Sequence, residues 1–413
     1  MLKRIGVHQL NLGMHLKEFC GSWMDHPFWR TDFVLLDAKD LETILASSIK
    51  EVWIDSAKSL DIVVGEPAVL EISLVLPVEV DRQRVADHRA GQVAPVSAAK
   101  ERARATKIVR QSKQAVMSMF EEARMGNAVD VGGAKQLVEE ISDSITRNPT
   151  ALISLARLKT IHDYTYMHCV AVCAMMVSLA RQLGLEEAQV RSAGLAGLLH
   201  DLGKAVMPLE VLNKPGKLTA EEFAVIKSHP VEGHKLLLER ADVEGIVLDV
   251  CLHHHEKTDG SGYPDGLKGG EISLFAKMGA VCDVYDAITS NRPYKPGWDP
   301  AESLRKMAEW ASGHFDPQVF QAFVKCMGIY PVGSLVQLTS GRIGVVVEQT
   351  SKSLTTPSVK VFFSTKSNLR ILPQVIDLSH PENRERIISR EDPAKLRFPD
   401  LNELWSDLPH TPW

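Results

Sequence analysis

The hydrophobic pattern changes period several times along the chain, and in residues 1–80 it predicts a small α+β domain. Three β-like runs occur there: Phe33–Leu36, Glu51–Ile54 and Leu70–Val80. One short helix is expected between the first two runs, with Asp40 as its N-cap and its end near Ser48. The aromatic cluster Trp23–Trp29 fits either a ligand-binding surface or a hydrophobic core with a turn, and we favour the core.

A helical period follows, and we assign residues 81–149 to a linker and connecting helices. The first helix covers Ala98–Arg124, and the second runs from about Gly133 to Arg147 and stops before Asn148-Pro149. The first helix has an apolar stripe, formed by Val109, Ala115, Val116, Met119 and Phe120. This stripe either pairs with a second copy of the chain, giving a homodimer, or packs onto its own domain.

The third part, residues 150–329, is predicted to be all-helical. The expected helical segments are Asp163–Leu183, Glu186–Leu199, one that begins at Thr219 and carries His229, one that ends in His253-His254-His255, and Leu274–Ser290. Glu222 completes a capping box with Thr219. These segments are joined by short polar stretches, which is typical of a compact helical domain.

A strand period returns after Tyr330. The runs SLVQL, GVVVEQ and SVKVFF predict strands, and Ser340-Gly341-Arg342 predicts a hairpin turn. Residues 330–380 are therefore expected to form a small β-rich appendage. The charged segment 381–413 is expected to be a tail that loops over the surface.

Composition limits the possible functions. The 413 residues include 45% hydrophobic and 24% charged residues, and the formal net charge is −5. A negative net charge disfavours DNA binding, so an anionic ligand would need a local positive site. The apolar run Cys169–Ala180 is too short to insert into a membrane, and the N-terminus lacks a signal peptide. The six cysteines show no framework spacing, so we expect a soluble cytoplasmic protein with reduced thiols.

Histidines concentrate in the helical part, which contains nine of the 15. Imidazoles and carboxylates on several apolar helices are costly to bury unpaired, and a bound metal removes that cost. Nitrogen and carboxylate ligands without thiolate suit Fe, Mn or Zn. The candidates from the helices are His168, His200, Asp201, His229, His253, His254, His255 and Asp283.

The order of these residues resembles a known family. His168, then His200-Asp201, then Asp283 is similar to the H…HD…D pattern of the HD phosphohydrolase superfamily. The stretch HHEKTDGSGYP, His254–Pro264, matches the pattern of its HD-GYP subfamily. The resemblance covers about Ile161 to Cys326 and implies an all-α HD-type catalytic domain. Residues 1–80 resemble, more loosely, an uncharacterised domain that often precedes HD-GYP domains and that would offer a surface for protein partners.

The resemblance implies a phosphodiesterase that hydrolyses cyclic di-GMP to linear pGpG, GMP or both. It implies two divalent metal ions, with Fe or Mn favoured, that share a hydroxide. Asp201 would bridge the two ions. One ion would take His168, His200 and Asp283, and the other would take His229, His254 and His255. His253 would lie outside the ligand set.

The resemblance also implies contacts with substrate. Lys204 would meet the scissile phosphate or the leaving oxygen. Arg292 and Lys295 would hold the second phosphate, since Arg binds phosphate through two parallel N–H bonds. Gly262, Tyr263 and Pro264 would form a wall over the metals, in which Tyr263 offers a flat face to guanine and a hydroxyl for a polar contact.

Three points stay open in the sequence. Glu256 and Asp259 either orient the neighbouring histidines or cap the backbone of their own loop. Tyr164 stands where some HD-GYP enzymes have a glutamate that helps to hold a third metal, so we expect only two metals, with Tyr164 packed beside them. The chain is expected to be an active enzyme, but two alternatives are a weak HD-GYP module that binds or scaffolds a cyclic dinucleotide and an HD enzyme that acts on another small molecule.

Overall fold

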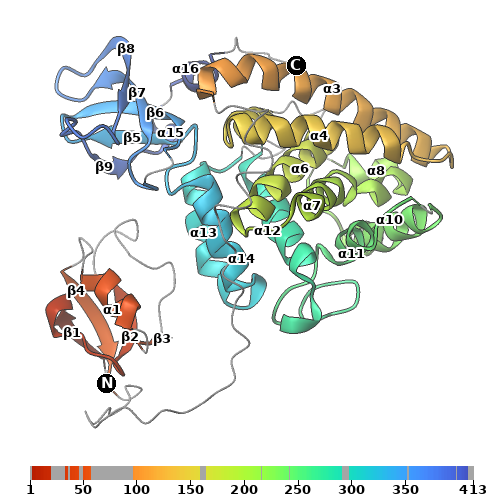
Figure 1. The fold of residues 1–413 in the computed structure, drawn as a ribbon, viewed down its shortest axis with the longest axis horizontal. Helices are drawn as coiled ribbons and strands as arrows, with labels where there is room; N and C mark the ends of the chain where they lie inside the picture. The colour runs from red at the N-terminus through yellow and green to blue at the C-terminus, as the bar shows by residue number, and fades with distance from the viewer. Residues whose placement is uncertain are drawn as a thin grey trace. The chain divides into compact units, whose positions relative to one another are not determined.

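The computed structural model describes two compact units, one within residues 1–80 and one within residues 81–413 (Figure 1). The described residues are 2–19, 33–35, 38–45, 50–56, 96–158, 164–214, 216–240, 242–290, 297–350, 353–396 and 398–407.

The first unit is an antiparallel sheet with a helix, which confirms the α+β prediction for its described residues. The strands, in the order β1-β4-β2-β3, are Leu2–Gly6, Glu51–Asp55, His15–Phe19 and Phe33–Val34. The short 3₁₀ helix η1 covers Val7–Gln9, and α1 covers Ala38–Leu45. The small core contains Leu16, Leu35, Ile44 and Val52, all fully buried.

Two predictions for this unit were wrong. Strands β1 and β2 lie where no strand was expected, because His15–Phe19 and Leu2–Gly6 gain their strand character from pairing with the central strand β4. Asp40 lies inside α1 rather than at its N-cap. The cluster Trp23–Trp29 and the run Leu70–Val80 lie outside the described residues.

The second unit begins with the two long helices that the sequence predicts. Helix α3 covers Ala98–Arg124 and α4 covers Val131–Arg147, which is capped by Asp130. The apolar stripe of α3 is buried within the chain at all its positions except the half-buried Ala115, because α3 packs on α4, on α5 (Ala151–Ala156) and on α6. The stripe therefore packs onto its own unit, and the homodimer stays a prediction that no longer has this stripe as its support.

The helical domain is arranged around α6, Tyr164–Gln182, which is buried from Met167 to Ala180. It contacts α3, α7, α12 and α14. The remaining helices of the domain are α7 Glu187–Leu199, η4 Leu202–Val206, α8 Leu209–Leu212, α9 Ala220–Ile226, α10 His229–Leu238, α11 Gly245–His253, η5 Gly269–Glu271, α12 Leu274–Thr289, α13 Pro300–His314 and α14 Pro317–Met327.

One helix assignment needs correction. The capping box of Thr219 and Glu222 is present at the start of α9, but this helix ends at Ile226. His229 is the first residue of the next helix, α10, and Pro230 occupies the first turn, where its missing N–H is tolerated. Among the described residues no helix is long and apolar enough to cross a membrane.

The C-terminal part forms a five-stranded antiparallel sheet in the order β8-β7-β6-β5-β9. The strands are β5 Leu335–Leu338, β6 Arg342–Glu348, β7 Ser358–Ser364, β8 Leu369–Asp377 and β9 Ile387–Arg390. The expected surface tail was wrong, because this segment supplies β9 and the short helices α15 Pro393–Leu396 and α16 Leu401–Ser406, whose Trp405 is buried.

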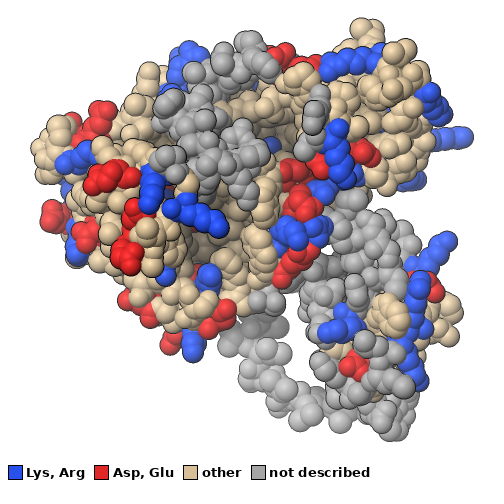
Figure 2. Space-filling view, turned by 180° about the vertical axis from the view of Figure 1, so that it is seen from behind, with Lys and Arg blue, Asp and Glu red and all other residues tan. Residues whose placement is uncertain are grey.

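The sheet is tied to the helices by specific polar contacts. Glu348 accepts hydrogen bonds from the backbone N–H of Ala98 and from the Asn148 side chain, at 2.8 and 3.0 Å. Arg390 of β9 donates to Asp299 and Glu302 at the start of α13. On the face seen in Figure 2, acidic and basic side chains are intermixed over the described residues, with no extended basic surface of the kind that binds DNA.

Candidate metal centre

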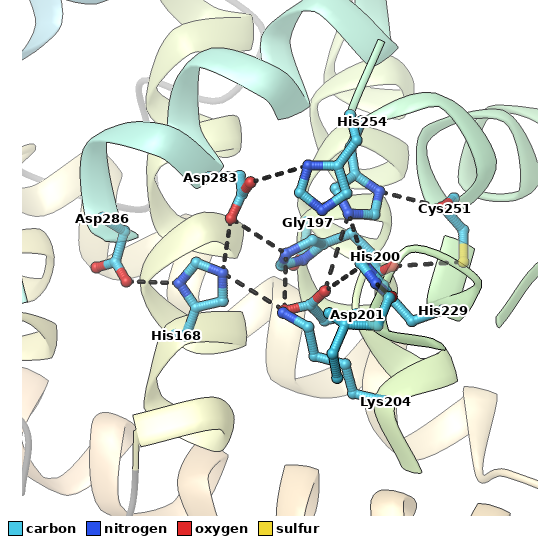
Figure 3. Close-up of polar contacts among 12 residues, drawn as sticks. His168, Gly197, His200, Asp201, Lys204, His229, Cys251, His254, Asp283 and Asp286 are labelled. Atoms are coloured by element: carbon cyan, nitrogen blue, oxygen red, sulfur yellow. Dashed lines mark hydrogen bonds and ion pairs between the residues drawn. The ribbon is translucent and has the colours of Figure 1, made fainter. Parts of the chain in front are cut away.

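Five segments of the helical domain bring ligand-type side chains to one point (Figure 3). Helix α6 supplies His168, the end of α7 supplies His200 and Asp201, and the first residue of α10 is His229. The end of α11 supplies His254 and His255, and α12 supplies Asp283. Their potential ligand atoms fall into groups within 4.8 Å of one another, which are His168–His200–Asp283, His229–His254–His255 and His200–Asp201–His254.

Gly203 makes this convergence possible. A Cβ atom at this position would lie 1.9 Å from the backbone oxygen of His229, so only glycine lets the segment after Asp201 approach α10. On the other side of the contact, Gly233 lies one helical turn beyond His229, and its backbone N would lie 2.5 Å from the same Cβ. The glycine of the HDLGK sequence therefore holds His229 beside the His-Asp pair.

Three of the histidines are oriented by backbone carbonyls. The Nδ1 atoms of His200 and His229 lie 2.8 and 2.7 Å from the carbonyl oxygens of Gly197 and Ile226. The Nδ1 of His254 lies 3.0 Å from the oxygen of Val250. A carbonyl only accepts, so each Nδ1 carries the proton and each Nε2 of a neutral ring presents a lone pair. The Nε2 atoms of His229 and His254 face each other at 3.2 Å.

Asp201 lies between the two groups of imidazoles. Its Oδ2 is 3.5 Å from His168 Nε2 and 3.4 Å from His200 Nε2. Its Oδ1 is 3.1 Å from His229 Nε2 and 3.8 Å from His254 Nε2. Each carboxylate oxygen therefore faces a different group. Burial would raise the pKa of Asp201, but Lys204 and His200 hold it well below its usual value, so this residue is a carboxylate.

His168 is held by acids instead of carbonyls. Its Nδ1 lies 2.6 Å from Asp286 Oδ2, and its Nε2 lies 2.9 Å from Asp283 Oδ1. Burial would lower the pKa of His168, but these two carboxylates raise it. The sequence analysis does not find the orienting role of Asp286. Its spacing of three residues from Asp283 on one helix was the available signal.

The histidines of the other group have the opposite electrostatics. Burial and the neighbouring imidazoles hold the pKa of His254 well below its usual value, and burial lowers that of His255 to about 3. Both rings are therefore neutral near pH 7, which is the form that binds a metal. His255 also lies near Asp283, with its Nδ1 3.7 Å from Asp283 Oδ2.

Lys204 lies at the edge of this cluster. Its Nζ is 2.5 Å from Asp201 Oδ2, and 19% of its side chain is exposed. Burial would lower the pKa of Lys204, but the charge of Asp201 raises it, so the side chain is a cation. This places a positive charge where the anionic substrate was predicted to meet it.

The loop after the histidines is built on the carboxylate of Glu256. This side chain accepts hydrogen bonds from the backbone N–H groups of Asp265, Gly266 and Leu267, at 2.7, 3.0 and 3.1 Å. A Cβ at Gly262 would lie 2.5 Å from the Cα of Glu256, so this glycine allows the loop to close on itself. Of the two alternatives for Glu256, capping the loop is therefore correct.

The other loop acid also serves the loop itself. Asp259 accepts a hydrogen bond from the backbone N–H of Ser261 at 2.8 Å. The extra histidine, His253, points away from the cluster, with its ring nitrogens 2.8 Å from Asp249 and 3.1 Å from Asp265. It therefore ties the end of α11 to the loop and stays outside the ligand groups, as the sequence predicts.

Tyr263 lies against the histidines, and its ring already contacts His255 and Lys227. Its ring stacks on His255, with centroids 4.7 Å apart and an angle of 28° between the planes. The ammonium group of Lys227 lies over the Tyr263 ring, 5.0 Å from its centroid. Stacking of a guanine on Tyr263 would therefore require Lys227 to move, whereas a contact with the hydroxyl group would not.

Of the four remaining residues that the sequence places at the site, two lie within the described residues and two lie outside them. Tyr164 stacks on His168, with centroids 5.8 Å apart and planes 7° from parallel, so it packs beside the site as expected. Pro264 follows Tyr263 through a cis peptide bond in the same loop. Arg292 and Lys295 lie outside the described residues.

The cluster has the donor set of a metal site. The Nε2 of His200 and the Oδ1 of Asp201 are buried and make no hydrogen bond to any described residue. Facing imidazole lone pairs next to two buried carboxylates are costly without a cation among them. Cys251 is turned away, since its Sγ lies 3.4 Å from the backbone oxygen of His200. The side chains thus fit divalent metal bound through nitrogen and oxygen ligands.

Comparisons with known proteins agree with this geometry. The family model described as HD domain matches residues 139–319, and a domain of unknown function (DUF3391) matches residues 2–134. The chain is 54% identical to a cyclic di-GMP phosphodiesterase of Pseudomonas aeruginosa, over 99% of this chain and 96% of that protein.

Two further relatives share only a part of the chain. The cyclic di-GMP phosphodiesterase response regulator RpfG of Xanthomonas campestris is 44% identical over 36% of this chain and 39% of that protein. A 3'3'-cGAMP-specific phosphodiesterase of Vibrio cholerae is 36% identical over 40% of this chain and 38% of that protein.

Proposed function

This chain belongs to the HD-GYP family of HD-domain proteins, and on that premise we propose that it hydrolyses cyclic di-GMP to linear pGpG, GMP or both. The observation that carries the proposal is the position of Asp201, whose two oxygens face two different groups of imidazoles. A relative with 54% identity over nearly the whole chain is named for this activity, which supports the choice of substrate.

We assign two divalent metals to the cluster, with Fe or Mn as the favoured ions. His168, His200 and Asp283 would hold one ion, His229, His254 and His255 would hold the other, and Asp201 would contact both. When bound, such a pair supplies Lewis acidity for the phosphoryl oxygens and lowers the pKa of water so that it attacks phosphorus near neutral pH. Asp286 would keep the ring of His168 oriented through its hydrogen bond to Nδ1.

The side chains around the metals neutralise charge and position the substrate in this proposal. Lys204 neutralises charge that develops on the scissile phosphate or on the leaving oxygen, and its position beside Asp201 supports this role. Tyr263 and Pro264 form the wall next to His255, and Gly262 allows the tight loop that carries them. Arg292 and Lys295 hold the second phosphate in this proposal, on the basis of the family pattern alone.

The test uses purified protein loaded separately with Fe(II) or Mn(II) and incubated with cyclic di-GMP. Chromatography and mass spectrometry identify pGpG and GMP, and elemental analysis gives the metal content. We expect two metals per chain and release of one or both products. Binding of cyclic di-GMP without turnover would instead identify a binding or scaffolding module.

A second substrate deserves the same assay. One relative is named as specific for 3'3'-cGAMP, and it is 36% identical to this chain over 164 residues. Parallel reactions with cyclic di-GMP and 3'3'-cGAMP decide between them. Faster hydrolysis of 3'3'-cGAMP would contradict the proposed substrate but not the proposed chemistry, whereas cleavage of neither would contradict both.

A further inference from the structure

Beside the metal cluster, Phe223, Lys227 and Tyr263 form an arrangement that the proposed chemistry does not use. The Lys227 ammonium lies 5.0 Å from the Tyr263 centroid and 5.0 Å from the Phe223 centroid, so it bridges the two rings. Tyr263 in turn stacks on His255. A continuous row of rings and one cation therefore leads from the cluster outward to α9.

The outer end of this row is open to solvent. Phe223 is 47% exposed, although a large aromatic ring at this position could be buried in a helical domain. Lys227 is exposed as well, and it makes no ion pair with any described residue. The positive charge and the solvent-exposed part of the Phe223 ring are thus both available to a ligand.

The position of Phe223 is fixed by its own helix. Thr219 and Glu222 cap α9 reciprocally, with Glu222 N–H 3.2 Å from Thr219 Oγ1 and Thr219 N–H 2.7 Å from Glu222. Lys214 adds an ion pair to Glu222 at 2.7 Å. These contacts hold the first turn of α9, so Phe223 and Lys227, four residues apart, face the same side of the segment.

We propose that Phe223 and Lys227 bind one guanine base of the cyclic dinucleotide, an inference that rests on the proposed function. The base stacks on the exposed ring of Phe223, since every nucleobase offers a flat face to an aromatic side chain. The flexible Lys227 side chain turns its ammonium group from the rings to the edge of the base, where it donates hydrogen bonds to O6 and N7, the acceptor pair that guanine presents. Adenine has an amino donor in place of O6, so Lys227 favours guanine.

Binding in this way agrees with the state of Tyr263. Because His255 stacks on the Tyr263 ring and Lys227 lies over it, the base finds a more exposed aromatic ring one step farther out, at Phe223. Tyr263 then acts as a spacer that sets the distance between the base site and the phosphate site. Its hydroxyl stays available for a polar contact.

The experiment compares four variants with the wild-type holoenzyme: Phe223→Leu, Phe223→Tyr, Lys227→Met and Lys227→Arg. Substrates are cyclic di-GMP, cyclic di-AMP and bis(p-nitrophenyl) phosphate, which has a phosphodiester but no purine. Phe223→Leu should raise KM for cyclic di-GMP on the order of tenfold relative to its effect on bis(p-nitrophenyl) phosphate. Phe223→Tyr keeps the aromatic face and should restore the wild-type value.

Lys227→Met should narrow the preference for cyclic di-GMP over cyclic di-AMP by roughly tenfold, because one bidentate contact with guanine discriminates by about that factor. Lys227→Arg keeps the donors and should retain the preference. Lys235→Met is the matched control, since Lys235 is an exposed lysine of α10 that pairs with Glu232.

Equal effects of Lys227→Met on all three substrates would show that Lys227 acts through Tyr263 and His255, and would overturn the base site. The base site would also be overturned if Phe223→Leu and Lys227→Met had the same KM values and the same substrate preference as the wild type and the Lys235→Met control. If the wild-type protein hydrolyses no cyclic dinucleotide, the proposed function itself is contradicted. The wild-type assay therefore distinguishes a failure of the proposed function from a failure of the base site.

Discussion

The metal cluster contains buried charged groups and the C-terminal sheet contains partly buried ones, but only the sheet satisfies them with its own atoms. In the sheet, Glu385 accepts hydrogen bonds from Arg342, from Thr339 Oγ1 and from the Ser340 N–H, at 2.6, 2.8 and 3.1 Å. In the cluster, His200 Nε2 and Asp201 Oδ1 make no hydrogen bond with the described residues.

This difference separates charge used for stability from charge used for binding. A paired carboxylate such as Glu385 adds to the stability of the fold and needs no ligand. The carboxylate of Asp201 lies among imidazole nitrogens whose lone pairs converge on it, so the arrangement is complete only with cations present. Variants in the metal cluster should therefore lose metal and activity, whereas variants in the sheet should lose stability.

The largest effect is expected for Asp201→Ala. Without this carboxylate two cations would face each other with no anion between them, so both metals should be lost or bound more weakly. Turnover should fall by more than the roughly 10–100-fold that outer partners of metal ligands cost. Elemental analysis and steady-state kinetics measure the two quantities. A variant with two metals and full turnover would disprove the bridging role.

Lys204→Ala should separate chemistry from metal binding. The ammonium group contacts Asp201 but is not a ligand, so the metal content should stay at the wild-type level. The value of kcat should fall on the order of 10²-fold, because transition-state charge loses its neutralising partner. Loss of metal in this variant would show instead that Lys204 has a structural role.

The cluster could be predicted from sequence because its residues are marked by local patterns. The adjacent His200 and Asp201, the His254-His255 pair and the GYP loop stand out in the chain, and the family resemblance supplies their order. The partners of these residues are not marked. The contact of Lys227 with Tyr263 depends on how α9 packs against the loop, which no local spacing reveals. For Asp286 the spacing of three residues from Asp283 places it on the same side of α12, but which residue it meets depends on how α12 packs against α6.

The same reason explains the errors at the two ends of the chain. Strand β9, Ile387–Arg390, has the sequence IISR inside a charged segment, and it becomes a strand because β5 offers it an edge. Strands β1 and β2 likewise depend on β4. Strand formation comes from pairing with distant residues, whereas helices such as α3 carry their periodicity within themselves.

Asp286→Ala tests one of the contacts that the sequence did not reveal. Removing the carboxylate frees Nδ1 of His168, so the ring loses its fixed orientation and its negative partner. Metal affinity should fall about 10–100-fold. Titration of apo-protein with Mn(II) measures it. Asp286→Asn keeps an oxygen that can accept from Nδ1 and should fall between the wild type and the alanine variant; equal affinities in all three proteins would contradict the orienting role.

The smallest effect is expected for Glu385→Gln, which should change stability and leave the metal site intact. Burial would raise the pKa of Glu385, but Arg342 and the other donors lower it to about 2, from an ordinary value of 4.5. A carboxyl group whose pKa is lower in the folded state stabilises the fold fully above its unfolded pKa, and it loses that contribution as the pH falls toward the folded pKa.

At pH 7 the substitution should therefore lower the free energy of unfolding by about 1 kcal/mol, the net contribution of a typical hydrogen bond, because Glu385 is partly exposed and glutamine keeps an acceptor oxygen. Urea unfolding of wild type and variant at pH 7, 5, 4 and 3.5 measures the difference. It should stay constant between pH 7 and 5 and shrink below pH 4.5, because the wild-type carboxyl group then begins to lose its advantage over the neutral amide. A difference in the free energy of unfolding that persists unchanged at pH 3.5 would mean that Glu385 does not stabilise the sheet through its charge. A loss of metal from the variant at pH 7 would mean that Glu385 also affects the metal cluster. Either result would contradict the contrast between the two regions.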